Sequence, residues 1–525
     1  MPILMRAARF ILVMLLPFVP TALLGQQQTR PPLHTSGHSI LDATGHVVRL
    51  TSVNWYGFDQ KEFVVGGLDH APLTTIIAQI REIGVNSVRL PWANETLESN
   101  PVVPDYAVKA NPQFRGKHAM EIMDAVITAL ARAHIMVILD NHVSRADWCC
   151  KDDDGNGLWY NAEYPEGKWL ADWGTIVRRY KNQPWVVGAD LRNELRSGAQ
   201  WGGNDPRLDW HAAAERGGNA VLAANPKLLL MVEGPEYSTD FTAFAKLPIT
   251  LNTPNRVVYS PHAYAIAGHT FQNYDELKQA YNARAGYLLH TEPGVPLWVG
   301  EFGECQTLQC GDRAQWFRWF VQYLRENDLG WSYWALNGTQ SSGIGRKYDE
   351  VETFGLLTPN YLHIAAPEMV RLLQTIESPP QTIPRELWGK WVVRRELPTT
   401  TISCRGEKEA KTLIGTEVEY APGFFRWHKW VTKNPAAKIT TITAEQFHDE
   451  NSGMGTNSSQ VTFQQLGIKA DKATQVVIQH PAANITGATT ETPGDNVLIK
   501  NENTIIFSVC SVYFEAERSA TLPRN

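Results

Sequence analysis

Short apolar runs alternate with helical patterns between about residues 48 and 337. Each run ends in a polar or aromatic cluster, and a segment with apolar residues at helical spacing mostly follows it. Candidate helices include residues 73–84, 119–134 and 172–181. The runs are VVRLTSVNWYGF, NSVRLPW, IMVILDNH, WVVGADLRNE, LLLMVEG, RVVYSPHAY, PLWVGEFG and LGWSYWALN. Eight such units over roughly 300 residues predict an α/β fold of the (β/α)8 TIM-barrel type.

A doubly wound sheet is the main alternative, because it also alternates strands and helices. It does not require eight units whose polar residues all gather at the carboxyl ends of the strands. The barrel is therefore the preferred prediction, and we place it at residues 26–376.

The amino-acid composition of the chain changes after Pro379. Closely spaced prolines in ESPPQTIPRE interrupt helix and strand alike, so residues 377–386 are predicted to form a linker. From LWGKWVV onward the chain is rich in Thr, Val and Ile with turn residues between them, which is typical of strands. We expect a separate all-β domain at residues 387–525, either a sandwich or a small barrel.

Residues 1–25 have the pattern of a secretory signal peptide. Arg6 and Arg9 precede an apolar run that ends near Gly25 and is short for a membrane span. An uncleaved anchor is the alternative. The six cysteines suit an oxidising compartment, with Cys305–Cys310 and Cys404–Cys510 as candidate pairs that the sequence alone does not decide. We therefore expect a secreted or periplasmic protein that leaves the membrane after signal cleavage.

The net charge of −6 without a long charge run argues against a nucleic-acid partner or adhesion to an anionic membrane. Tryptophan is more informative, because clefts that bind flat sugar rings use its side chain as a stacking platform. The chain has 18 tryptophans. Core packing nevertheless accounts for most of them.

Two carboxylates stand at the ends of predicted strands on opposite sides of the barrel. Glu194 ends the fourth strand and Glu301 ends the seventh. In a barrel of eight strands their side chains face each other across the mouth. Such a pair cleaves a glycosidic bond when one group is a protonated acid and the other an ionised nucleophile or base. The alternative for each glutamate alone is a helix cap or an ion pair.

Seven separated motifs then resemble glycoside hydrolase family 5 over about residues 35–370. They are NWYGF, NSVRLP, LDNH, RNE, SPHAY, GEFG and WSYWALN, in the order expected of that family. The stretches GADLRNE, LWVGEFG and VQYLRE are similar to bacterial endo-β-1,4-glucanases of the family. The stretches DNHVSRADWCCKDDDGNG, LRNELR and WSYWALNG look closer to its plant "cellulase family" branch.

The resemblance implies roles for eight residues in a retaining mechanism that needs no cofactor. Glu194 would be the acid/base and Glu301 the nucleophile, with their carboxyl groups only ~5–5.5 Å apart. Arg89 would orient Glu301 and hold it ionised, since a nearby cation lowers a carboxylate's pKa. The remaining implied substrate-site residues are Asn193 at the sugar 2-hydroxyl, Tyr264 on the nucleophile, His142 and His262 along the subsite, and Trp334 beneath the sugar ring.

Two positions depart from the family pattern. The family's usual proline after the acid is Leu195 here, and the plant-like branch shares this NEL sequence, so we do not interpret it as loss of catalysis. Leu336 stands where the bacterial endoglucanases carry a tryptophan, so we expect one aromatic contact fewer and a shifted substrate preference.

Residues 152–163, DDDGNGLWYNAE, match the calcium loop of an EF-hand. Asp152, Asp154, Asn156 and Glu163 have the spacing of its oxygen ligands. The preceding segment is nevertheless a predicted strand end rather than a helix. The preferred interpretation is a loop beside the substrate groove, with Trp159 and Tyr160 as sugar contacts. Calcium binding is the alternative.

The C-terminal domain faintly resembles small lipocalin-like barrels that begin with Gly-x-Trp. Its GFFRWHKW segment could form a sugar-binding platform from Phe424, Phe425, Trp427 and Trp430. We favour the interpretation that these aromatics are barrel core with a capping edge.

The leading hypothesis is a secreted, monomeric endo-β-glucanase-like hydrolase acting on a polysaccharide or oligosaccharide. Another activity of the family is the first alternative: mannan hydrolysis, exo-glucosidase action, transglycosylation or glycoconjugate hydrolysis. A non-catalytic sugar-binding protein is the second, although it would most simply have lost one of the two glutamates. A calcium-dependent adhesion module is the third.

Overall fold

The computed structural model describes residues 29–265, 271–377, 383–399, 411–433, 435–451, 461–479, 492–509 and 512–519. The predicted signal peptide at 1–25 and the proposed Cys404–Cys510 pair lie outside these residues. Within them, the search for a helix long and apolar enough to span a bilayer finds none.

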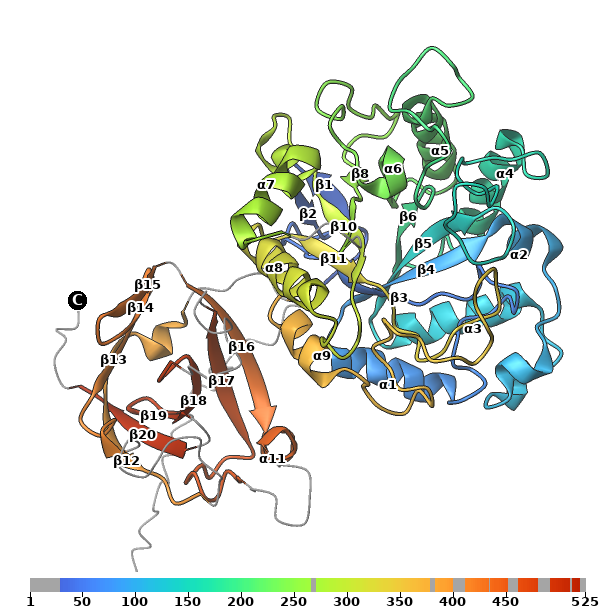
Figure 1. Ribbon diagram of the computed structural model, residues 1–525. Coiled ribbons are helices and arrows are strands. Elements are labelled where there is room, and N and C mark those ends of the chain that lie inside the picture. Colours follow the sequence, from blue (N-terminus) through green and yellow to red (C-terminus); the bar gives the residue numbers. More distant parts are fainter. Residues whose placement is uncertain are drawn as a thin grey trace, which may run out of the picture.

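A parallel sheet forms the first domain, with helices around it (Figure 1). Its strand order is β8-β7-β6-β5-β4-β3-β11-β10-β9. The strands are β3 (Thr51–Asn54), β4 (Ser87–Ala93), β5 (Met136–Val143), β6 (Val186–Asp190), β7 (Leu229–Val232), β8 (Val257–Tyr259), β9 (His262–Tyr264), β10 (Trp298–Gly303) and β11 (Gly330–Tyr333). All eight predicted strands are present, and the (β/α)8 prediction is confirmed.

The sixth predicted strand closes the barrel. The structure divides it at Ser260 and Pro261 into β8 and β9. Strand β8 pairs with β7 at one end of the sheet, and β9 pairs with β10 at the other. One continuous stretch of chain thus joins the two edges of the sheet.

Helices cover the outside of the barrel. In chain order they are α1 (Leu73–Ile83), α2 (Asn94–Ser99), α3 (Ala119–Arg132), α4 (Glu166–Arg179), α5 (Trp210–Ala224), α6 (Pro235–Ser238), α7 (Tyr274–Arg284), α8 (Asp312–Glu326) and α9 (Pro367–Gln374). Short 3-10 turns are η1 (Asp105–Val108), η2 (Pro112–Phe114), η3 (Gly286–His290) and η4 (Arg385–Leu387). A hairpin of β1 (His34–Ser36) and β2 (Ser39–Leu41) contributes Ile40 to the apolar cluster at the strand starts.

Hydrophobic periodicity explains these elements. Every residue of β5 is buried, as expected of a parallel strand with other residues packed on both faces. Helix α3 buries Ile122, Val126 and Leu130, a spacing of four residues that places one apolar stripe against the sheet. The barrel therefore presents its strand ends, rather than its faces, to solvent.

The second domain is a single antiparallel sheet in the order β15-β14-β13-β12-β20-β19-β18-β17-β16. Its strands are β12 (Gly389–Glu396), β13 (Glu417–Ala421), β14 (Phe424–Trp427), β15 (Trp430–Lys433), β16 (Ala436–Thr443), β17 (Lys472–Gln479), β18 (Asn496–Asn501), β19 (Thr504–Val509) and β20 (Val512–Arg518). Helix α11 (Ala444–Asn451) follows β16. Tyr420 and Phe425 share one core cluster with Ala437 and Val476 from the opposite end, so the sheet curls around its own core. The all-β prediction is confirmed.

The aromatic segment of this domain divides between core and surface. Phe425 and Trp427 belong to the core cluster, whereas Phe424 is half-buried and Trp430 is 65% exposed. A shared platform of all four rings is therefore not formed.

Two disulfides occur among the described cysteines. Cys305 bonds to Cys310, as one of the candidate pairings has it. Cys149 bonds to its neighbour Cys150, a pairing that the sequence analysis did not propose.

A buried carboxyl on α4 makes stability depend on pH. Burial raises the pKa of Asp172 to about 7, and the hydrogen bond from Asn94 only partly offsets this. Between pH 4 and 7 the folded chain therefore holds a proton that the unfolded chain releases, so this contribution to stability falls as pH rises. We expect the melting temperature to fall less between pH 5 and 8 in Asp172→Asn than in wild type. Parallel curves for the two proteins in calorimetry would contradict this.

Candidate active site

A cleft of about 330 Å³ opens at the carboxyl ends of the barrel strands. Glu301 lies within β10, and Glu194 follows β6. The predicted site residues that line the cleft are His142, Asn193, Glu194, Tyr264, Glu301 and Trp334. The other two, Arg89 and His262, are almost fully buried and contact the two glutamates directly. All eight predicted residues are therefore together at one site.

The two glutamates are close. One carboxylate oxygen of Glu194, one of Glu301 and a ring nitrogen of His262 all lie within 4.8 Å of one another. This separation is closer to the ~5–5.5 Å of retaining glycosidases than to the ~6.5–9.5 Å by which inverting enzymes leave room for an attacking water.

Arg89 is the fixed positive charge beneath the cleft. Its guanidinium is fully buried and donates to Glu301 Oε1 (2.6 Å), Asp190 Oδ2 (2.9 Å), Glu233 Oε1 (2.9 Å), Asn193 Oδ1 (2.9 Å) and Asn54 Oδ1 (3.0 Å). Burial alone would lower the pKa of Arg89, but the carboxylates of Asp140, Asp190, Glu301 and Glu233 raise it well above its usual value. The charge is therefore permanent.

Tyr264 holds the other oxygen of Glu301. Its hydroxyl donates to Glu301 Oε2 at 2.8 Å. Burial and the charge of Glu301 raise the pKa of Tyr264 well above its usual value, so the hydroxyl keeps its proton. Glu301 thus accepts one charged and one neutral hydrogen bond, and its orientation is fixed from both sides.

His262 connects Glu194 to a third carboxyl. Its Nδ1 lies 3.1 Å from Glu194 Oε1 and its Nε2 lies 3.3 Å from Glu233 Oε1. Burial favours the neutral ring, but Glu233, Glu301 and the hydrogen bond to Glu194 outweigh it and raise the pKa of His262 well above 6.5. The neighbouring carboxyls therefore favour the doubly protonated imidazole.

The positive charge of His262 lowers the pKa values of the carboxyls beside it. Burial would raise the pKa of Glu194, but the hydrogen bond and charge of His262 lower it below 4.5 overall. Burial also raises the pKa of Glu233 and the charge of His262 opposes this rise, so Glu233 and His262 titrate as a pair. In the empty site Glu194 is therefore ionised, with an acidic proton beside it on His262 Nδ1.

The turn after β6 gives Glu194 an unusual backbone. Its φ is 44°, in the left-handed region that non-glycine residues adopt mainly where neighbours enforce it. Its N–H donates to Glu233 Oε2 at 2.7 Å, which anchors the turn. Leu195, at the family's proline position, is fully buried in the core, so this departure leaves the acid at the cleft.

Asn193, His142 and Trp334 also line the cleft. His142 Nδ1 donates to Asp140 Oδ2 at 2.7 Å, and burial lowers the pKa of His142, so the ring is neutral with its lone pair on Nε2. The ring planes of His142 and Trp334 are nearly parallel, and the ring centroids are 5.5 Å apart. Trp334 also stacks on Tyr56.

Several functional-site residues were not among the predictions. Glu233 and Asp140 both stand at strand ends, in LLLMVEG and LDNH, so the signal that identified Glu194 was present for them as well. The unpredicted cleft residues are Trp148, Cys149, Cys150, Arg346, Glu352, Thr353 and Phe354. They come from loops after β5 and β11, where no periodic pattern marks them.

Leu336 does not lie in the cleft. It is fully buried in the barrel core, and its N–H donates to Asn54 O at 2.8 Å. The shifted substrate preference stays a prediction, and Trp148 and Phe354 are the cleft's aromatic residues besides Tyr264 and Trp334.

The acidic loop uses its oxygens for protein contacts. Asp152 accepts from the Tyr237 hydroxyl, Asp154 pairs with Arg196, and Asn156 Oδ1 accepts from Ser144 N. Glu163 lies 3.7 Å from Arg145. Among the described residues, the acidic side chains of this loop do not form a group that is close enough to share an ion.

The aromatic residues of the same loop, Trp159 and Tyr160, do not line this cleft. Trp159 is fully buried, packs on Trp210 and donates to Glu166 Oε2. The Tyr160 hydroxyl donates to Arg207 O. The expectation of a sugar contact is wrong for Trp159, because this ring is buried in the core. Tyr160 is half-buried and does not line the cleft of Glu194 and Glu301, so its sugar contact stays a prediction.

Chelation should leave the fold unchanged. Because arginine, tyrosine and backbone donors already satisfy Asp152, Asp154 and Asn156, EDTA should not lower the melting temperature. Added CaCl2 should not raise it. A fall of several degrees in EDTA that calcium reverses would restore the calcium alternative.

Two clusters of three side chains at the site, each containing carboxylates, have the spacing of metal ligands. They are Glu194–His262–Glu301 and Asp140–Asp190–Glu233. Arg89 donates to Glu301 in the first group and to Asp190 and Glu233 in the second. A protein cation thus already balances part of the charge in both.

Comparisons with known proteins give a consistent result. Residues 41–340 match the family model for cellulase (glycosyl hydrolase family 5). The chain is 32% identical over 343 residues to an endoglucanase of Paenibacillus polymyxa, covering 61% of this chain and 83% of that protein. It is 31% identical over 369 residues to the major extracellular endoglucanase of Xanthomonas campestris, covering 67% of this chain and 70% of that protein.

A plant relative and a solved structure extend the comparison. A glycosyl hydrolase 5 family protein of Chamaecyparis obtusa is 30% identical over 376 residues, covering 67% of this chain and 66% of that protein. A complex of an endocellulase from Pyrococcus horikoshii with cellotetraose superposes with a TM-score of 0.58 at 26% identity. It covers 67% of this chain and all of that one.

Proposed function

The chain belongs to glycosyl hydrolase family 5 and is a glycoside hydrolase of the cellulase type, and from this premise we propose that it is a secreted, retaining endo-β-glucanase. Glu301 is the nucleophile and Glu194 the acid/base. The observation that carries the proposal is the spacing of these carboxylates, which lie within 4.8 Å of each other and of His262. Only the retaining mechanism uses carboxyl groups so close together.

In the first step, Glu301 attacks the anomeric carbon and the glycosidic oxygen leaves. Arg89 and Tyr264 each donate to one carboxylate oxygen of the nucleophile and so hold both oxygens in place. When the sugar enters, the proton on His262 Nδ1 passes across 3.1 Å to Glu194, which then gives it to the leaving oxygen and is left as a carboxylate. The product of this step is a glycosyl ester on Glu301.

In the second step, water hydrolyses the glycosyl ester on Glu301. Glu194 is now a carboxylate and takes a proton from the attacking water, and the C1–O bond to Glu301 breaks. Retention of configuration follows from the two successive displacements. The mechanism requires no cofactor.

Asn193, His142 and Trp334 position the sugar whose bond is cut. The amide nitrogen of Asn193 donates to its 2-hydroxyl, His142 lines the same edge of the ring, and Trp334 supports it from below. Because Arg89 binds Asn193 Oδ1, the amide is oriented with its nitrogen toward the cleft side. Nucleophile and substrate are thus oriented by the same guanidinium.

The substrate and the compartment are inferred from relatives. Cellotetraose bound to the Pyrococcus horikoshii enzyme supports a β-linked gluco-oligosaccharide as the ligand of this cleft. The extracellular location in the name of the Xanthomonas campestris relative supports secretion, in agreement with the signal-like N-terminus. We propose that the enzyme acts as a monomer.

Reducing-end release tests the proposed activity. The purified chain without residues 1–25 is incubated with soluble β-glucans, mannan and xylan, and Glu301→Gln serves as the control. We expect cleavage of a β-1,4-glucan by the wild type and none by the variant. Cleavage of mannan alone, or the same release by both proteins, would contradict the proposal.

A further inference from the structure

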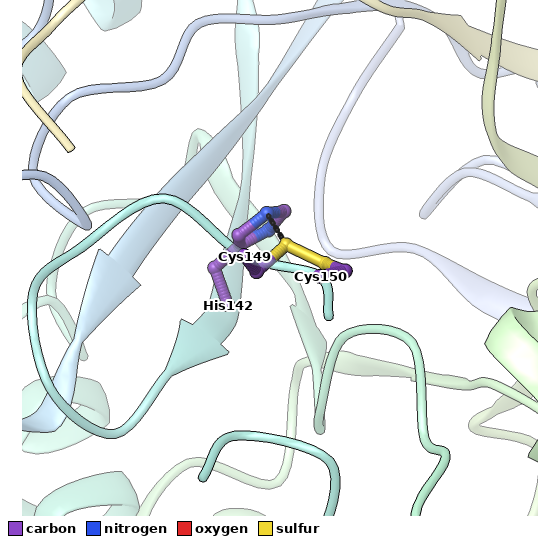
Figure 2. A group of neighbouring side chains, drawn as sticks. All are labelled: His142, Cys149 and Cys150. Carbon is purple, nitrogen blue, oxygen red and sulfur yellow. Dashed lines mark hydrogen bonds between the residues drawn. A yellow bond between two sulfur atoms is a disulfide. The ribbon is translucent and has the colours of Figure 1, made fainter. Parts of the chain in front are cut away.

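The Cys149–Cys150 disulfide lies inside the catalytic cleft. Both cysteines line it together with Asn193, Glu194 and Glu301. Figure 2 shows the two sulfurs next to the His142 ring, with Cys149 joined to it by a contact of 3.6 Å. Cys149 also packs on the apolar side chains of Val143 and Ala146, which fix this end of the loop.

Both sulfurs of the disulfide lie near the amide nitrogen of Asn193. This nitrogen lies 3.9 Å from Cys149 Sγ, 3.9 Å from Cys150 Sγ and 3.4 Å from His142 Nε2. The opposite end of the amide cannot take its place, because Asn193 Oδ1 accepts from Arg89 at 2.9 Å. Two hydrogens therefore face the cleft side of the amide.

The groups next to these two hydrogens, His142 and the disulfide sulfurs, do not offer a strong acceptor to each of them. The His142 lone pair on Nε2 can accept one, over a long contact. The other faces sulfur, which is a weak acceptor. A sugar hydroxyl oxygen is a better partner than either sulfur, so the amide gains a hydrogen bond when a sugar enters.

We propose that the Cys149–Cys150 disulfide is a substrate-contacting element, an apolar wall against the C–H surface of the sugar beside Asn193. Its sulfurs leave the Asn193 amide free to bind the sugar hydroxyl. This inference rests on the proposed function for the identity of the sugar, a β-linked glucose unit. It makes an intact disulfide a condition for tight substrate binding.

Reduction should change this wall chemically. An added dithiol transfers two electrons and two protons, so the S–S bond is replaced by two S–H groups while the dithiol closes to its own disulfide. The two thiols no longer share a bond, and each can donate into the cleft. The sugar then meets polar hydrogens where an apolar surface stood, and contact is lost.

The test compares the oxidised and the reduced full-length mature chain. Alkylation and mass spectrometry establish the state of residues 149 and 150 in each sample. We expect reduction to raise KM for cello-oligosaccharides about fivefold, equivalent to roughly 1 kcal/mol of binding, with a smaller change in kcat. Cys149→Ala combined with Cys150→Ala should show a raised KM that the dithiol no longer changes.

The second disulfide provides the matched control. Cys305→Ala combined with Cys310→Ala removes a bond that does not line the cleft, so its KM should respond to the dithiol as in wild type. If confirmed reduction of Cys149–Cys150 leaves KM unchanged, the proposal is wrong. The same holds if both thiols alkylate in the untreated protein.

Binding separates this proposal from the proposed function. Titration of cellotetraose into Glu301→Gln needs no turnover, and reduction should weaken its Kd by about the same factor. Weakened binding alongside a wild type that cuts no glucan would support the disulfide wall and reject the glucanase activity. Equal Kd values, or no binding in either state, would reject the wall.

Discussion

Replacement of Glu301 by Gln should reduce hydrolysis of β-glucan by on the order of 10⁴-fold or more, because the variant has no nucleophile. The amide oxygen can still accept from Arg89, and the amide nitrogen can face the Tyr264 hydroxyl, which can accept as well as donate. The cleft should therefore keep its shape. Initial rates and calorimetric binding of cellotetraose measure the two properties separately, and binding should be nearly unchanged.

A neighbouring glutamate serves as the control. Glu304 is also buried at the end of β10, but it pairs with Arg313 and does not line the cleft. Glu304→Gln should therefore retain turnover. If Glu301→Gln and Glu304→Gln lose activity to the same extent, the loss reflects general damage to this loop rather than a missing nucleophile.

Replacement of Glu194 by Gln should produce a loss that depends on the leaving group. Natural β-glucan needs a proton on its departing oxygen, so the first step should slow by about 10²–10⁴-fold. An aryl cellobioside with an activated phenol leaves without that proton, and its first step should change little. The burst of phenol in rapid mixing measures this step alone, before the slower release of the ester.

The leaving-group series also tests the proton path. In His262→Gln the side chain at position 194 remains, but the proton at 3.1 Å is gone. Its pattern should resemble that of Glu194→Gln, with a smaller loss. Equal losses of the first step on activated and unactivated substrates in Glu194→Gln would contradict its assignment as the acid.

The barrel and its strand-end carboxylates could be predicted because both depend on local pattern. Continuous apolar runs specify buried parallel strands, and the residue that ends such a run must reach the mouth of the barrel. Glu194 and Glu301 were identified in this way. Glu233 carries the same signal and was missed, since a pair of carboxylates already explained the chemistry.

Features that depend on tertiary contact could not be predicted. The positive φ of Glu194 arises from the N–H bond to Glu233, which is 39 residues away. The raised pKa of His262 arises from carboxyls at the ends of three different strands. Spacing alone suggested calcium ligands at Asp152 and Asp154, but Tyr237 and Arg196, both distant in sequence, take up those oxygens.

Aromatic residues were the least predictable. Trp159 and Trp334 were both expected to contact sugar, yet Trp159 is in the core and only Trp334 lines the cleft. Exposure of a tryptophan depends on which neighbours can cover it, and these are known only once the chain has folded. In the second domain, likewise, the sequence did not show that Phe425 is buried and Trp430 exposed.

Trapping the glycosyl-enzyme tests the central claim most directly. The wild type is incubated with a 2-deoxy-2-fluoro-cellobioside that carries an activated leaving group, which slows release of the ester more than its formation. The account predicts a mass increase of one fluorocellobiosyl group, located by peptide mapping on Glu301. Absence of any adduct in an enzyme that hydrolyses the parent substrate, or an adduct on Glu194 or Glu233, would contradict it.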